Sequence, residues 1–131
     1  MYGLFVTDKN EAEIIQFENE NMMKVLKKHV DGYVEVVHPM MLQNPFIMIV
    51  NEMGRFREDF DLNMFGSFLY QGVIVGPIVI VKEGWVGDEK DIIGLSYEEA
   101  EELKQRLMTT EAFGAKKDEV LRRMSELWGE K

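Results

Sequence analysis

The sequence contains no cysteine, which excludes disulfide bonds, thiolate metal sites and a cysteine nucleophile. It has only two histidines, His29 and His38, and they do not form the His-Glu-x-x-His spacing of zinc enzymes. Neither a Gly-Lys-Ser/Thr phosphate loop nor a Gly-x-Ser-x-Gly nucleophile elbow occurs. The sequence therefore predicts no metal, no cofactor and no enzyme of these classes.

Long hydrophobic runs are also missing. The longest, Val73 to Val81, is interrupted by Pro77 and falls short of the roughly 20 residues that cross a bilayer. The first ten residues lack the basic start and long apolar segment of a signal peptide. We therefore expect no membrane association and a cytoplasmic location, and the absence of cysteine suits a reducing compartment.

Positive charge is scarce, since the net charge is −9 with 24 acidic and 15 basic residues. Residues 32–95 hold nine acids and four bases, a balance of −5. Nucleic-acid binders concentrate positive charge, so we expect no direct nucleic-acid binding. The acidic middle region suits a basic protein partner, mimicry of nucleic acid by an inhibitor, or simple solubility.

Apolar residues that alternate or cluster predict more strands than helices. Helical spacing is found in residues 21–30, 63–70, 97–108 and 116–128. The expected strands are residues 2–7, 11–18, 32–39, 46–50, 55–57 and 73–83, with residues 92–95 as a candidate short strand, although residues 11–20 also fit a helix. The fold class is α+β, with a largely antiparallel sheet of five or six strands, one early helix and two C-terminal helices. Residues 1–95 form the sheet domain, and residues 96–131 form a helical hairpin packed on it or extending it.

Local signals predict where these elements begin and end. Gly32 is expected to end the first helix in the left-handed conformation. Residues 51–54 fit a hairpin turn, with residues 55–57 returning along the partner strand. Ser96 and Glu99 form a capping box, and residues 84–91 are expected to be a loop because they are rich in glycine and charge.

Four segments, VDGYVEVVHP, IVNEMGRF, LNMFGSFLY and VIVGPIVIV, occur in an order that resembles a family of small domains of unknown function. Such domains are found in phage, plasmid and other mobile-element genes, so the resemblance implies a bacterial or phage setting and no particular activity. The matching residues are Gly32, Tyr33, Glu35, Asn51, Glu52, Gly54, Asn63, Leu69, Tyr70, Val75 and Gly76.

Residues 57–63, REDFDLN, place Asp59, Asp61 and Asn63 at alternate positions, as at the start of an EF-hand loop. Counted from Asp59, positions six and twelve are Met64 and Tyr70, where calcium coordination needs glycine and glutamate. We therefore expect an ordinary extended segment with its carboxylates outward, and Asn63 as the cap of the helix that follows.

Glu35 lies within an apolar strand, on the same face as Tyr33 and Val37. If both faces of the sheet are covered, Glu35 is partly buried and could share an acid/base role with Glu52. If one face is open, Glu35 is an ordinary exposed carboxylate. The first alternative predicts a small hydrolase or ligand-binding domain that uses Glu35, Glu52, Asp59 and Asp61 with His38.

The absence of a catalytic motif favours another hypothesis, a non-enzymatic protein-binding or regulatory protein of phage or mobile-element type. The candidate interaction residues are Glu35, Glu52, Asp59, Asp61, Trp85 and Trp128. Apolar side chains on the last predicted helix, including Trp128, also suggest a homodimer formed through the C-terminal helices.

Overall fold

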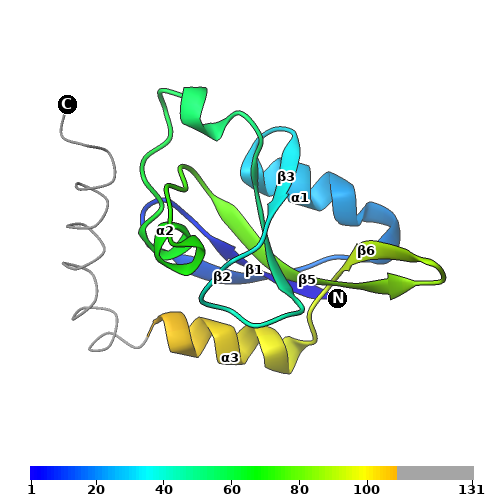
Figure 1. Ribbon diagram of the computed structural model, residues 1–131. Coiled ribbons are helices and arrows are strands. Elements are labelled where there is room, and N and C mark those ends of the chain that lie inside the picture. The colour runs from blue at the N-terminus through cyan, green and yellow to red at the C-terminus, as the bar shows by residue number, and fades with distance from the viewer. Residues whose placement is uncertain (109–131) are drawn as a thin grey trace.

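The computed structural model describes residues 1–108 and contains one six-stranded sheet with helices on both faces (Figure 1). The elements are β1 (Tyr2–Val6), β2 (Ala12–Gln16), α1 (Met22–Val30), β3 (Val34–Val37), β4 (Phe46–Asn51), α2 (Met64–Tyr70), β5 (Ile78–Val86), β6 (Glu89–Ile93) and α3 (Tyr97–Leu107). Short 3-10 turns occur at Asn19–Asn21 and Gly54–Phe56. The predicted α+β class with a largely antiparallel sheet is confirmed, and α1 is the predicted early helix.

The strand order is β2-β1-β5-β4-β3, with every pair antiparallel, and β6 pairs with the outer half of β5. Of residues 11–20, which fitted strand or helix, Ala12–Gln16 form β2 in a hairpin with β1, and a 3-10 turn begins at Asn19. At the centre of the sheet, Ile80 lies between Leu4 of β1 and Met48 of β4. Because strands buried on both faces need apolar side chains at successive positions, the run Ile78–Val81 takes the central place. The outer strands of this order are β2 and β3, and β6 is also paired on one side only.

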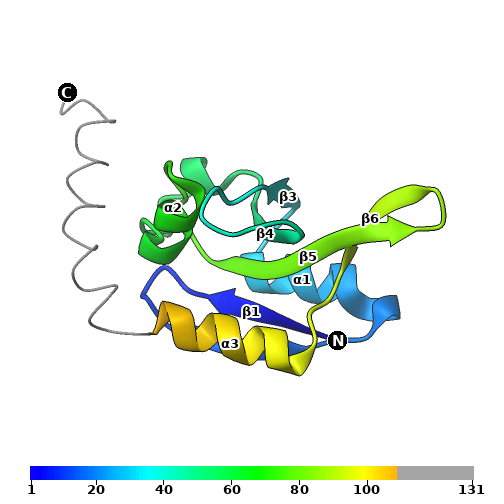
Figure 2. The same cartoon turned by 60° about the horizontal axis from the view of Figure 1, so that its bottom comes forward.

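Two clusters of buried side chains fill the space between the helices and the sheet. On one face, Leu26 and Val30 of α1 pack with Ile47, Ile49 and Val81. On the other face, residues of α2 and α3 pack with the side chains that alternate with these along the strands. The residues of this second cluster include Leu4, Met48, Phe65, Leu69, Ile80, Ala100, Leu103 and Leu107. The result is three layers, with α1 on one side and α2 and α3 on the other (Figure 2).

The end of α1 differs from the prediction, because Asp31 and not Gly32 takes the left-handed conformation, at φ 61° and ψ 48°. Arg57 holds Asp31 in this position by donating to its main-chain oxygen at 3.1 Å and to its carboxylate at 2.8 Å. Gly32 is needed for a different reason. A Cβ atom at that position would lie 2.7 Å from Nδ2 of Asn51, so only glycine allows this close approach.

The predicted return strand at residues 55–57 is wrong. The Asn51 side chain accepts a hydrogen bond from the Met53 amide at 2.7 Å, and the chain curls into the 3-10 turn Gly54–Phe56. The sheet also leaves no place for such a strand, because β4 already has β3 on one side and β5 on the other. The predicted turn at residues 51–54 therefore leads away from the sheet.

The loop predicted at residues 84–91 is also wrong in most of its length. Residues 84–86 continue β5, residues 89–93 form β6, and only Gly87 and Asp88 make the turn. Gly87 has φ +66°, a conformation that glycine adopts without strain. The charged residues belong to the exposed outer part of this hairpin, which projects beyond the rest of the sheet (Figure 2). Pro77, by contrast, stands just before β5, as a residue without an amide donor should.

The predicted capping box of α3 is confirmed. The Ser96 hydroxyl accepts from the Glu99 amide at 3.1 Å, and the Glu99 carboxylate accepts from the Ser96 amide at 2.8 Å. The same carboxylate pairs with Lys82 of β5 at 2.9 Å. Burial alone would raise the pKa of Glu99, but the Ser96 amide and the Lys82 ammonium outweigh it and lower that pKa below its ordinary value.

Replacing Glu99 by glutamine should therefore change how stability depends on pH. A carboxyl group with a lowered pKa in the folded state stabilises the protein above its unfolded pKa, and this stabilisation is lost as pH falls through the folded value. At pH 7 we expect Glu99→Gln to be less stable than the wild type by about 0.5–1 kcal/mol. Urea unfolding between pH 7 and pH 3 should show the two proteins converging below about pH 4. A difference that stays constant over this range would contradict the prediction.

Residues 97–107 of the predicted C-terminal hairpin are α3, which packs in the same core as the sheet. The predicted second helix at 116–128, with Trp128 and the proposed dimer surface, lies outside the described residues. Within residues 1–108, no helix is long and apolar enough to cross a membrane.

Candidate functional site

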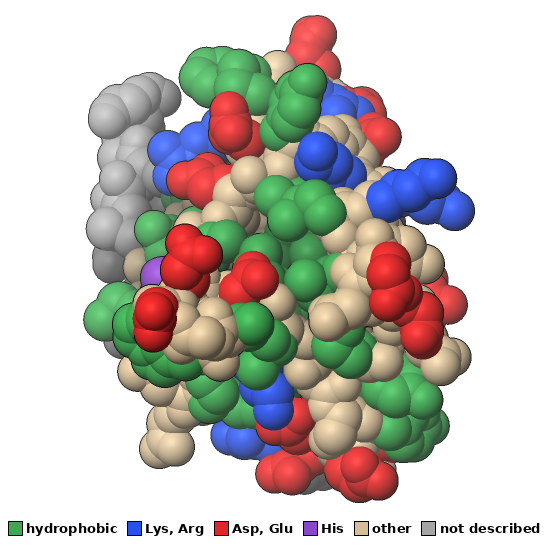
Figure 3. Space-filling model, turned by 90° about the vertical axis from the view of Figure 1, so that its right-hand side faces the viewer, with side chains coloured by type: hydrophobic (Ala, Val, Ile, Leu, Met, Phe, Trp, Pro, Cys, Tyr) green, Lys and Arg blue, Asp and Glu red, His purple; other side chains and the backbone are tan. Residues whose placement is uncertain are grey.

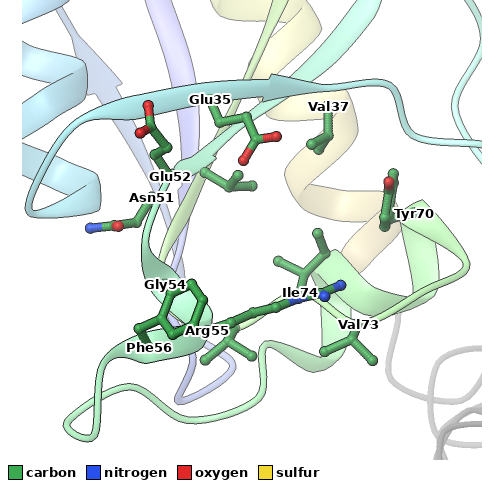
Figure 4. Close-up of a pocket in the computed structure, with 12 residues that line it drawn as sticks. Glu35, Val37, Asn51, Glu52, Gly54, Arg55, Phe56, Tyr70, Val73 and Ile74 are labelled. Carbon is green, nitrogen blue, oxygen red and sulfur yellow. The ribbon is translucent and has the colours of Figure 1, made fainter. Parts of the chain in front are cut away.

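A cavity of about 300 Å³ opens beside the edge strand β3, on the face of the sheet that carries α2 (Figure 4). Its walls come from β3 and β4, from the 3-10 turn that follows β4, and from the end of α2 with the segment leading to β5. The lining residues are Glu35, Val37, Val50, Asn51, Glu52, Gly54, Arg55, Phe56, Tyr70, Val73, Ile74 and Val75.

The position of Glu35 follows from the strand register. Glu35 lies opposite Val50 and Val37 lies opposite Met48, so both side chains are on the face covered by α2 and α3. Both faces of the sheet are covered, as one prediction for Glu35 required. Glu35 is nevertheless exposed, because β3 is the edge strand and the cavity lies beneath it. It is a strand carboxylate at the mouth of a cavity.

Three charged side chains line the cavity, and they point in different directions. The Glu35 carboxylate points from β3 into the cavity, whereas the Glu52 carboxylate is turned away from its centre (Figure 4). The Arg55 side chain crosses the opposite wall toward Val73 (Figure 4). Within residues 1–108, none of the three side chains makes an ion pair or a side-chain hydrogen bond. In the described part of the chain, all three charges therefore lack an internal partner.

Between these charges the wall is apolar, formed by Val37, Val50 and Ile74. Phe56 stands at one side of the cavity with 78% of its surface exposed, and Tyr70 of α2 stands at another. Aromatic side chains supply much of the binding energy at protein interfaces, because they bury a large area on contact. The cavity thus combines a carboxylate, a guanidinium and apolar surface at one sheet edge.

The turn that carries Arg55 and Phe56 is fixed by Asn51, which is 7% exposed. The Asn51 amide points away from the cavity and donates to the main-chain oxygens of Val30 and Asp31 at 2.9 and 3.0 Å (Figure 4). It thereby joins the end of β4 to the end of α1.

The turn also lies close to the segment before β5. A Cβ atom at Gly54 would stand 3.0 Å from the Val75 oxygen, so glycine allows the two walls of the cavity to approach.

The opposite wall is held by Asn63 and Ser67. Asn63 is fully buried, and its amide donates to the main-chain oxygens of Gly76 at 2.8 Å and Val6 at 3.1 Å. Its side-chain oxygen accepts from the Gly66 amide, so the predicted cap of α2 is confirmed. The Ser67 hydroxyl bonds both the amide and the oxygen of Ile74. These bonds hold residues 73–76 against α2.

Asp59 and Asp61 do not line the cavity. Asp59 accepts two hydrogen bonds from Arg57, at 2.7 and 2.8 Å, and this contact lowers its pKa. Asp61 pairs with Lys9, and its amide donates to Asp8. The two carboxylates are thus bound to different cations. Within residues 1–108, no group of three or more acidic or histidine side chains is placed to hold a metal ion.

His38 also lies away from the cavity. Its Nε2 contacts the Glu83 carboxylate at 3.0 Å, and Lys90 lies 3.5 Å from the same carboxylate. The hydrogen bond from His38 is the main cause of the lowered pKa of Glu83. The other histidine, His29, is half-buried in α1 with its Nδ1 2.8 Å from the Val25 oxygen.

Trp85 lies in the outer part of the β5–β6 hairpin with 69% of its surface exposed, so it is available for contact but remote from the cavity. Figure 3 looks at the end of the molecule from which this hairpin projects. Acidic side chains on that face form separate groups with hydrophobic and basic side chains between them (Figure 3). A mimic of nucleic acid would need a more continuous arrangement of carboxylates.

Residues 1–108 match the model of a protein family described as a domain of unknown function, DUF3846. The chain belongs to this DUF3846 family. The match ends one residue after α3, so the sheet, its three helices and the cavity all belong to the DUF3846 domain. Searches among curated proteins and among solved structures each found no match.

Most residues that carried the sequence resemblance lie in or around the cavity of this DUF3846 domain. Those that line it are Glu35, Asn51, Glu52, Gly54, Tyr70 and Val75. Gly32, Asn63 and Gly76 brace its walls, whereas Leu69 is in the core and Tyr33 is exposed beside Lys27. Sequence reasoning missed Arg55 and Phe56, because it placed them on a strand. The aromatic residue between two arginines, RFR, was the one sequence signal that could have identified them.

Proposed function

We propose that the protein is a non-enzymatic protein-binding or regulatory module, of phage or mobile-element type, that holds its partner through the cavity beside β3. The observation that carries this proposal is a set of three charges, Glu35, Glu52 and Arg55, that have no partner within residues 1–108 and surround an apolar cavity with Phe56 exposed beside it. Within residues 1–108, some other basic side chains, such as Arg57 and Lys82, pair with carboxylates of the domain itself. Charged groups left unpaired at one concave place favour a ligand there.

The orientations of the acids favour binding over hydrolysis. A pair of catalytic carboxylates must face one reacting bond, but Glu52 turns away from the cavity that Glu35 enters (Figure 4). His38 already contacts Glu83, and Asp59 already contacts Arg57. A small hydrolase built from these residues would need Glu52, His38 and Asp59 to change their positions.

A photocrosslinking experiment tests the proposal. Replacing Phe56 with p-benzoylphenylalanine puts a reactive group beside the cavity in a side chain of similar shape. The matched control carries the same reactive residue in place of Met23, a side chain of α1 on the other face of the sheet that is 40% exposed. In lysate of the source cells we expect a discrete crosslinked protein from position 56 only.

The crosslink should weaken as salt is raised from about 50 to 500 mM, because charges are screened over roughly 10 Å at 0.1 M salt. Identical products from both positions, or no product from position 56, would contradict the proposed function.

A further inference from the structure

The edge of β3 presents backbone groups with no partner in the described structure. The Glu52 amide donates to the Tyr33 oxygen at 2.9 Å, so Tyr33 and Glu52 form a hydrogen-bonded pair. In an antiparallel ladder, hydrogen-bonded pairs alternate with non-hydrogen-bonded pairs. Glu35–Val50 and Val37–Met48 are therefore hydrogen-bonded pairs as well. The N–H and C=O groups of Val34 and Val36 therefore point away from β4.

These outward groups can accept another strand. Extended peptides add to exposed sheet edges by main-chain hydrogen bonds, while pockets for alternate side chains provide the specificity. On a strand added antiparallel to β3, one residue would lie directly opposite Glu35 as a non-hydrogen-bonded pair, the arrangement in which side chains are closest. That residue's side chain would share the face of Glu35 and meet the cavity beneath β3.

The charge of Glu35 determines which side chain is favourable at the opposite position of the added strand. An opposite charge across strands is favourable, and a like charge directly opposite is unfavourable. Glu35 has no ion-pair partner in residues 1–108. Among these residues, the one basic side chain that lines the cavity, Arg55, lies on the far wall. A second copy of this chain, paired antiparallel about Glu35, would bring two glutamates together. A basic side chain from another protein fits where an acidic one or a second copy does not.

We infer that the partner contributes an extended segment that adds to the open edge of β3 and places one lysine or arginine side chain in the cavity against Glu35. This inference rests on the proposed function, and it specifies the chemistry of the partner. The cavity, at about 300 Å³, is at the small end of ligand pockets, which suits a single side chain.

Selection from a random library of twelve-residue peptides on the immobilised full-length chain tests the inference. The enriched peptides should carry a lysine or arginine flanked by β-branched or aromatic residues. Synthetic versions should bind Glu35→Gln about tenfold more weakly, because a charged hydrogen bond is lost. Arg55→Gln should bind them more tightly, since a repelling positive charge is removed. The wild-type chain without peptide should show no association through this edge in light scattering.

Val36→Pro tests the backbone contact. Proline removes an N–H that points away from β4, so the sheet keeps its own hydrogen bonds while the added strand loses one. We expect binding to weaken about threefold to tenfold. A second measurement leaves the protein unchanged: methylating alternate peptide amides should abolish binding in one register and leave it intact in the other.

Enriched peptides without a basic residue, binding that is indifferent to Glu35→Gln and to amide methylation, or a library that yields no enriched peptide would each overturn the inference. The proposed function is tested independently, by the crosslink from position 56. If position 56 crosslinks a partner but these peptide results are negative, the module binds proteins in another way.

Discussion

Replacing Asn63 by alanine is expected to lower the free energy of unfolding by roughly 3–4 kcal/mol. Asn63 is fully buried, and its side chain makes three hydrogen bonds, to Val6, Gly66 and Gly76. Alanine would leave the Gly66 amide without its cap and remove the donor shared by two main-chain oxygens. Buried polar groups that lose their partners bear the full cost of desolvation. One substitution would thus loosen α2, β1 and the cavity wall together.

Urea unfolding followed by circular dichroism measures this loss, with Asn19→Ala as the matched control because Asn19 is exposed. The control should stay within about 0.5 kcal/mol of the wild type. Asn63→Asp keeps the shape but sets a carboxylate against two main-chain oxygens, so it should be at least as damaging at pH 7 and recover partly near pH 4, where the protonated acid can donate. An Asn63→Ala protein as stable as the control would contradict the role assigned to this residue.

Replacing Gly76 by alanine should cost about 3 kcal/mol, for two separate reasons. Gly76 has φ +90°, which strains any residue with a Cβ atom. That Cβ atom would also lie 2.5 Å from Cδ2 of Phe60, whose ring covers this position. The substitution should therefore displace Phe60 and, with it, the segment that holds the cavity wall.

Gly87→Ala separates the two causes, because Gly87 has φ +66° with nothing near its missing Cβ. This control should cost about 1 kcal/mol, from strain alone. Adding Phe60→Ala to Gly76→Ala should cost less than the sum of the two single substitutions, since removing the Phe60 ring also removes the clash. Equal losses for Gly76→Ala and Gly87→Ala would show that the contact with Phe60 contributes nothing.

Much of the fold could be predicted because its signals are local. Asn63 caps the helix that directly follows it, and Ser96 and Glu99 are three residues apart, so both contacts can be read from adjacent residues. The run of apolar residues before Lys82 required a strand buried on both faces. These patterns identified the α+β class and most elements.

The errors arose where distant residues decide the structure. Residues 55–57 fitted a returning strand, but β5 had already taken the place beside β4. Residues 84–91 were not recognised as a hairpin because they are rich in charge. An exposed ribbon has no buried face, so its apolar side chains need not alternate. The cavity joins Glu35 to residues 20 and 40 positions away, and no local signal connects them. Arg55 and Phe56 were therefore missed as members of the site.

The placement of β5 between β1 and β4 has a consequence for biosynthesis. The strand that joins the two halves of the sheet, β5, leaves the ribosome only after both the β1–β2 and β3–β4 hairpins. Until then the nascent chain carries two apolar hairpins with open inner edges and nothing to bridge them. Unpaired strand edges promote aggregation, and long-range pairing is slow. We therefore expect a chain truncated before residue 78 to be insoluble, and the intact chain to benefit from chaperones that bind early in translation.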